Sequence, residues 1–158
     1  MITIQTDREA LFLATKMEEF AVDLYHRAFL LLTLEKDDPE LVNSVAELMN
    51  QEKRHLQDFQ KMQGYLSGQN PEKNRQNEMV LSAVAEGILF EGGLMGALRR
   101  GMFKTVEEVF AGAEKAEQNS IATYTQLAEQ TSSPEAAHLL KWIAKEEGEH
   151  LKALQQKA

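Results

Sequence analysis

Cysteine is absent from this chain of 158 residues. The protein therefore has no disulfide bond, no zinc ribbon, no thiolate nucleophile and no cysteine-bound iron–sulfur cluster. Proline and glycine are scarce, at 3 and 9 residues, whereas Ala, Leu, Glu, Gln and Lys are abundant. This composition favours long helices, and we expect an all-α protein.

Clusters of basic residues and long apolar runs are also missing. The 25 acidic residues outnumber the 17 basic ones, so the net charge of −8 offers nothing to attract nucleic acid. The run AFLLLTL (28–34) is too short to cross a bilayer. The first residues, MITIQTDREA, lack the basic start and apolar run of a secretory signal. We expect a cytoplasmic protein that binds neither nucleic acid nor membrane.

Four long helices are predicted by their starting patterns. Two begin with a Thr followed three positions later by Glu, which is a capping box. The other two begin with a capping residue directly before a proline. The four predicted N-cap residues are Thr6, Asp38, Thr105 and Ser133. Each helix should run for roughly 24 to 30 residues, a length that suits a helix bundle.

The spacing of these helices predicts one domain, residues 1–158, built from two helical hairpins. The first hairpin is predicted at 6–67, a crossover at 68–104 and the second hairpin at 105–157. Within the crossover we expect a short helix at MVLSAVAEGILF (79–90). Two hairpins joined by one long connection are typical of a four-helix bundle with a single crossover.

The two predicted hairpins repeat one another. In each first helix a Glu is followed seven residues later by a Tyr, and each second helix carries a Glu-x-x-His pair. The four pairs are Glu18 with Tyr25, Glu52 with His55, Glu117 with Tyr124, and Glu147 with His150. Every one of these glutamates interrupts an apolar stripe at helical spacing. Four carboxylates and two imidazoles should therefore point into the core.

Four buried carboxylates would repel one another strongly unless they were neutralised. Two divalent cations would balance their charge, and neutral imidazoles would complete the coordination. A single Glu-x-x-His pair on a helix is usually surface. Two copies in register, with a further Glu from each of two other helices, form the donor set of a dinuclear carboxylate site. This mixture of oxygen and imidazole ligands suits iron or manganese.

The segments MEEFAVDLY, DDPELVNSVAELMNQEKRHL, AEKAEQNSIATY and SPEAAHLLKWIAKEEGEHL resemble the rubrerythrin-like branch of the ferritin-like superfamily. The resemblance implies a ferritin-like four-helix bundle holding two iron ions. It implies six ligands: Glu18, Glu52, His55, Glu117, Glu147 and His150. It also implies that Tyr25 and Tyr124 orient carboxylates. Glu114, one turn before Glu117, is either a further ligand or a solvated surface residue.

The resemblance implies a homodimeric di-iron oxidoreductase that reduces hydrogen peroxide or activates dioxygen. The alternative is a ferroxidase that oxidises Fe(II) and handles or stores iron. A third interpretation is a bundle whose metals only stabilise the core. Full-length rubrerythrins carry a rubredoxin-like domain with four cysteine ligands, and this chain has no cysteine. We therefore expect an external electron donor.

The remaining titratable residues near these patterns are predicted to be surface groups. His26 lies off the apolar stripe, and His138 lies near the start of its helix. Glu19, Glu146 and Glu149 neighbour the proposed ligands but should point to other faces of their helices. We expect all five to be solvated.

Overall fold

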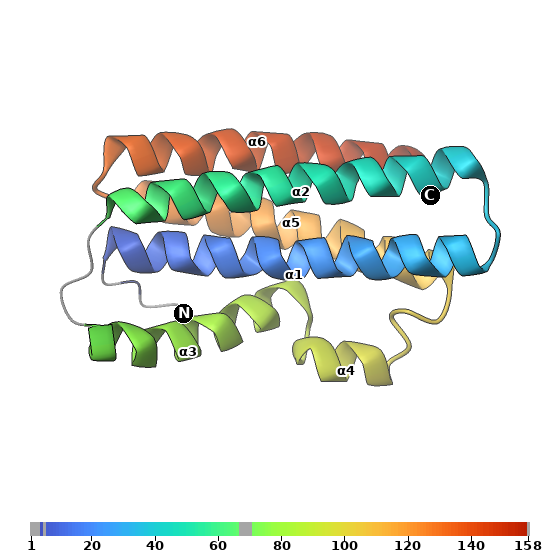
Figure 1. Cartoon of the computed structure of the whole chain (residues 1–158), viewed down its shortest axis with the longest axis horizontal. Helices are drawn as coiled ribbons and strands as arrows, with labels where there is room; N and C mark the ends of the chain where they lie inside the picture. The colour runs from blue at the N-terminus through green and yellow to red at the C-terminus, as the bar shows by residue number, and fades with distance from the viewer. Residues whose placement is uncertain (1–3, 5, 67–70, 158) are drawn as a thin grey trace.

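The computed structural model describes residue 4, residues 6–66 and residues 71–157. Over these residues the chain forms six α-helices and no strand: α1 (Asp7–Leu34), α2 (Pro39–Tyr65), α3 (Pro71–Leu89), α4 (Gly93–Arg99), α5 (Val106–Gln130) and α6 (Pro134–Lys157). The four long helices α1, α2, α5 and α6 lie lengthwise beside one another (Figure 1). This confirms the predicted all-α, ferritin-like four-helix bundle.

The long helices begin where their capping residues predict. Each of the four N-cap side chains accepts a hydrogen bond from a backbone N–H of the first turn, at 3.1 or 3.2 Å. All three prolines of the chain, Pro39, Pro71 and Pro134, are the first residues of helices. Proline is favoured there because its missing N–H would have no partner within the helix.

The crossover joins α2 to α5, and both of these helices run toward the same end of the bundle (Figure 1). The chain must therefore return along the length of the bundle, and it does so through α3 and α4. The predicted short helix is the second half of α3, which begins earlier, at Pro71. The short helix α4 was not predicted. Residues 67–70, at the predicted junction of hairpin and crossover, lie outside the described residues, as do 1–3, 5 and 158.

Helix α3 packs against α1 and α5. The Asn119 side chain on α5 donates a 2.8 Å hydrogen bond to the carbonyl oxygen of Ile88, near the end of α3. After α3 the chain turns through Gly92 and Gly93, whose φ angles are 74° and 79°. Glycine adopts this left-handed backbone conformation without steric penalty. The turn separates α3 from α4.

One stretch in the crossover, Glu78–Arg99, is long and apolar enough to cross a membrane by length and composition. Part of the stretch packs into the core, for example Leu81 and Phe90, whereas Met79 and Val80 are 76% and 64% exposed. The stretch is not one continuous helix, since α3 ends at Leu89 and α4 begins at Gly93. A single stretch of this kind is weak evidence for a membrane span.

Asp7, the first residue of α1, is hydrogen-bonded to the turn between α5 and α6. The two Asp7 carboxylate oxygens accept hydrogen bonds from the Ser132 N–H at 3.0 Å, the Ser132 hydroxyl at 2.8 Å and the Ser133 N–H at 2.9 Å. These bonds join the first hairpin to the second at one end of the bundle.

The apolar stripes pack together between the four long helices. Leu11, Phe59, Leu140 and Ile143 are fully buried, at 0% exposure. The stripe residues that are only half-buried are Leu41, Met62 and Ile121. The core is therefore apolar toward both ends of the bundle, and the polar residues interrupt it in the middle.

Candidate metal centre

All six predicted metal ligands meet at the middle of the bundle, with exposures between 0% and 4%. Each of the four long helices contributes at least one of them. The ligands are Glu18 from α1, Glu52 and His55 from α2, Glu117 from α5, and Glu147 and His150 from α6. One chain supplies the whole set.

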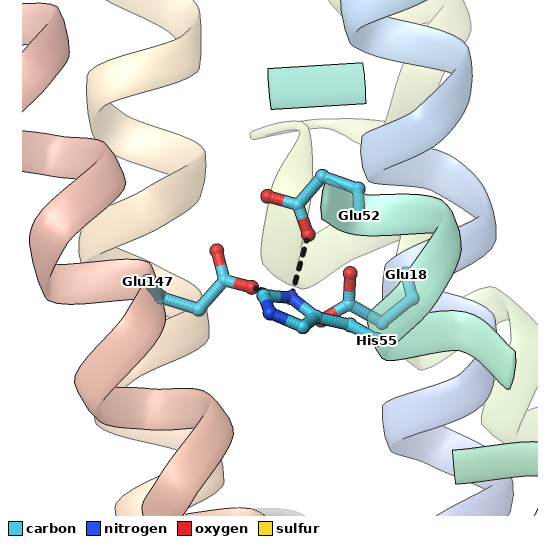
Figure 2. A group of neighbouring side chains, drawn as sticks. All are labelled: Glu18, Glu52, His55 and Glu147. Atoms are coloured by element: carbon cyan, nitrogen blue, oxygen red, sulfur yellow. Dashed lines mark hydrogen bonds and ion pairs between the residues drawn. The ribbon is translucent and has the colours of Figure 1, made fainter. Parts of the chain in front are cut away.

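The ligand atoms fall into two overlapping groups. In one group, atoms of Glu18, Glu52, His55 and Glu147 all lie within 4.8 Å of one another, and Figure 2 shows these four side chains converging. The second group has the same spread and consists of Glu52, Glu117, Glu147 and His150. Glu52 and Glu147 belong to both groups. The two groups of possible metal ligands are therefore adjacent and share two carboxylates.

Each histidine reaches the shared glutamate of the opposite hairpin. The Nδ1 atom of His55 lies 2.8 Å from Oε1 of Glu147, and the Nδ1 atom of His150 lies 3.0 Å from Oε1 of Glu52. The two imidazole rings stack with centroids 5.4 Å apart and planes inclined by 18°. The sequence repeat therefore becomes a pseudo-twofold arrangement in which both Nδ1 atoms face the carboxylates.

Each tyrosine binds the unshared glutamate of the opposite hairpin. The Tyr25 hydroxyl donates to Oε1 of Glu117 at 2.5 Å, and the Tyr124 hydroxyl donates to Oε1 of Glu18 at 2.9 Å. Burial, reinforced by the facing glutamate charge, raises the pKa of both tyrosines well above its usual value. The hydroxyls therefore keep their protons and remain donors. The predicted second-sphere contacts of both tyrosines are present.

The other oxygen of each unshared glutamate indicates how a metal would fit. Oε2 of Glu18 and Oε2 of Glu117 are buried and have no hydrogen-bond partner among the residues that the structure describes. An unpartnered buried carboxylate oxygen is costly and rare in folded proteins. One such atom lies in each half of the cluster, and a cation in each half would provide the partner that is missing. The residues present therefore fit two metal ions.

Electrostatics inside the cluster support the same conclusion. Burial, and then the charges of neighbouring carboxylates, raises the pKa of Glu18, Glu117 and Glu147. Burial also acts to raise the pKa of Glu52, but the adjacent Glu18 carboxyl and hydrogen bonds from the two histidines outweigh it and lower that pKa. The Glu117 carboxylate, 3.8 Å from Nδ1, and the hydrogen bond to Glu52 overcome burial and raise the pKa of His150 to about 10. Without metal the cluster retains protons, and divalent cations would replace them.

Glu114 lies outside both groups of ligand atoms. Its side chain is half-buried on α5, one helical turn before Glu117. A turn advances the helix by about 5.4 Å, which carries the residue away from the level of the cluster. At the corresponding position of the first hairpin, the Thr15 hydroxyl donates to the carbonyl oxygen of Leu11 at 2.7 Å. The structure gives Glu114 no contact with the other predicted ligands.

Glu146 is partly exposed as predicted, at 40% of its side chain, but it makes a contact that the sequence did not reveal. Its Oε1 lies 2.9 Å from Nε2 of His55. Periodicity could not show this contact, because Glu146 lies off the apolar stripe of α6 and its partner reaches across from α2. The other surface predictions are confirmed: His26, His138 and Glu149 are exposed, and Glu19 is 41% exposed in an ion pair with Lys16.

Comparison with known proteins supports the interpretation of the second hairpin. The family model described as Rubrerythrin matches residues 101–157, which include α5 and α6 together with Glu117, Glu147 and His150. No curated protein and no solved structure matches the chain significantly. The predicted rubrerythrin-like character is thus confirmed on the second hairpin. With the buried carboxylate–histidine cluster, it indicates a metal site of the di-iron kind.

Proposed function

We propose, from the rubrerythrin match of residues 101–157 and the paired cluster that this hairpin completes, that the protein is a di-iron oxidoreductase that reduces hydrogen peroxide. The observation that carries the proposal is the sharing of Glu52 and Glu147 between two four-residue groups. Two shared carboxylates would hold two metal ions side by side, and two Fe(II) ions together supply the two electrons that reduce one peroxide.

Burial of the cluster restricts its substrate to small molecules. None of the six ligand residues is more than 4% exposed, so a large organic substrate has no direct access to them. Hydrogen peroxide and dioxygen are small enough to enter such a site by transient opening of the surrounding side chains. The apolar core around the cluster also excludes bulk water, which strengthens the electrostatic interactions within it.

Two iron ions bound here would supply two electrons per turnover by cycling between Fe(II) and Fe(III). Reduction of one hydrogen peroxide to two water molecules consumes two electrons and two protons. In the protein, Tyr25 and Tyr124 hold protons at Glu117 and Glu18, on the two sides of the cluster. Each hydroxyl fixes one carboxylate oxygen and leaves the other free to bind a metal. The tyrosines thus position the carboxylates and keep protons next to the reacting centre.

Restoring Fe(II) after each turnover requires an electron donor. Cysteine is absent from the chain, so an iron–sulfur relay of the rubredoxin type cannot be built from its own residues. We therefore include an external donor protein or small reductant in the proposal. Because the chain has no cysteine, it also lacks the nucleophile that thiol peroxidases use.

The proposal is tested on anaerobic protein loaded with two Fe(II) per chain. The loaded protein is mixed rapidly with hydrogen peroxide or with dioxygen, and the near-ultraviolet absorbance of ferric iron is followed. We expect much faster oxidation by peroxide, with the iron retained by the protein. Gel filtration after the reaction, followed by iron analysis, measures retention.

Two other results would replace this function. Fast oxidation by dioxygen, with further Fe(II) taken up afterwards, would establish the ferroxidase alternative. Oxidation that is equally slow with either oxidant, with both irons retained, would indicate metals that only stabilise the core. Failure to bind two Fe(II) would refute the dinuclear site.

A further inference from the structure

The two histidines of the cluster differ in what their outer nitrogens contact. Both use Nδ1 toward the shared carboxylates. Nε2 of His55 faces outward to Oε1 of Glu146, at 2.9 Å. Among the described residues, His150 makes its hydrogen bond and its ion-pair contacts through Nδ1 alone. The pseudo-twofold symmetry of the ligands therefore does not extend to the contacts of the two Nε2 atoms.

The sequence repeat explains this difference. Glu146 directly precedes the shared ligand Glu147, and the corresponding residue before Glu52 is Gln51. The Gln51 side-chain amide donates to Glu47 on its own helix, at 3.4 Å. A carboxylate accepts a hydrogen bond from an imidazole N–H, and this bond is stronger than the bond that a neutral amide oxygen would accept. Only one of the two copies therefore has a charged group at this position.

We infer that Glu146 is a positioning residue for His55, holding the Nε2–H tautomer with Nδ1 aimed at the metal, and that it makes the two metal positions unequal. The inference rests on the proposed di-iron site. A carboxylate behind a ligating imidazole fixes the ring orientation and increases the basicity of the coordinating nitrogen. The position formed by Glu18 and His55 is consequently the tighter of the two.

Partial exposure suits Glu146 to this role. Its side chain is 40% exposed, so the carboxylate stays hydrated on one side while it contacts the buried imidazole on the other. Replacing it removes no large buried volume and leaves the apolar core intact. The effect of a substitution should therefore appear in metal binding, with folding preserved.

The test is a titration of the metal-free full-length protein with Co(II), followed by the absorbance of the bound ion. The wild-type protein should bind two Co(II) with unequal affinities. Glu146→Ala should weaken one of the two by about 10- to 100-fold, the range for loss of a carboxylate behind a metal-bound histidine. Glu146→Gln should lose less, because an amide oxygen still accepts the Nε2–H bond.

Two further variants sharpen the comparison. Glu149→Gln removes the same charge from an exposed position on the same helix, where Glu149 pairs only loosely with Lys152 at 3.9 Å, and it should leave both affinities unchanged. Gln51→Glu places a carboxylate at the corresponding position of the first hairpin. It should strengthen the weaker Co(II) position and bring the two affinities closer together.

A second measurement does not depend on affinity. Nitrogen-15 NMR of the Zn(II)-loaded protein should show His55 with Nε2 protonated and Nδ1 bound. In Glu146→Ala that signal should broaden or shift, while the signal of His150 stays in place. Two equal Co(II) affinities in the wild type, or unchanged binding by Glu146→Ala, would overturn the inference and leave the di-iron function standing. A wild-type protein that binds neither Co(II) nor Fe(II) would refute both.

Discussion

The substitution Glu117→Gln separates two effects of the buried carboxylates: their effect on the free energy of unfolding and their contribution to metal binding. Burial and nearby charge raise the pKa of Glu117, as they do for Glu18 and Glu147. The folded, metal-free protein therefore holds protons that the unfolded chain releases above the ordinary glutamate pKa of 4.5. The resulting contribution to stability is complete below that value and is lost as pH rises through the folded pKa.

The size of this effect follows from proton linkage. Each proton retained only by the folded state lowers the free energy of unfolding by about 1.4 kcal/mol per pH unit. The fall begins at the unfolded pKa of 4.5 and continues up to the raised pKa of the folded carboxyl. The pKa of His150 is raised from 6.5 to about 10, so the folded protein also retains this proton above pH 6.5 and continues to lose stability as pH rises. The metal-free protein should become less stable as pH rises.

Glu117→Gln removes one of these groups without changing its shape. The amide oxygen can still accept the hydrogen bond that Tyr25 donates at 2.5 Å. The metal-free variant should show a pH slope shallower by up to about 1.4 kcal/mol per unit. Above pH 4.5 we expect the metal-free variant to be more stable than the wild type, and we expect weaker metal binding by the group that contains Glu117.

The assay is urea unfolding with a chelator present, followed by far-ultraviolet circular dichroism at several pH values. Glu149→Gln is the matched control, since it removes the same charge from a side chain that is 65% exposed. Adding metal should reverse the trend, because metal binding needs deprotonated ligands and strengthens as pH rises. A metal-free wild-type protein that gains stability between about pH 5 and about pH 7 would refute this reasoning.

Three further predictions concern particular contacts. Glu52→Ala should abolish binding of both metals and Glu18→Ala should spare one, because Glu52 belongs to both ligand groups and Glu18 to one; metal analysis of gel-filtered protein measures this. Tyr124→Phe removes the 2.9 Å hydrogen bond to Glu18 and should lower Co(II) affinity about 10- to 100-fold. Asp7→Ala removes three hydrogen bonds at the α5–α6 turn and should cost about 1–2 kcal/mol in urea unfolding, with two metals still bound.

Each of these has an outcome that contradicts it. One metal remaining in Glu52→Ala would show that the carboxylate is not shared. Wild-type Co(II) affinity in Tyr124→Phe would mean that the hydroxyl does not orient Glu18. Loss of metal from Asp7→Ala would show that the cluster depends on the bundle end more strongly than the local contacts indicate.

Much of the fold could be predicted because its causes are local in sequence. The caps at Thr6, Asp38, Thr105 and Ser133 act within three residues, and all four form as predicted. The crossover was less predictable. Its sequence is rich in Gly and polar residues near both ends, and packing against α1 and α5 stabilises α3 in a segment with weak periodicity. Tertiary contacts there supply what local propensity does not.

By itself the sequence determined which six residues gather at mid-bundle. Helical periodicity places them on inward faces, and the duplicated hairpin places them at matching heights. Only the tertiary structure decided how they pair. Periodicity carries no information about contacts between helices, so it could not show that each tyrosine and each histidine reaches the opposite hairpin. For the same reason it missed the contact of Glu146 with His55, which depends on how α2 packs beside α6.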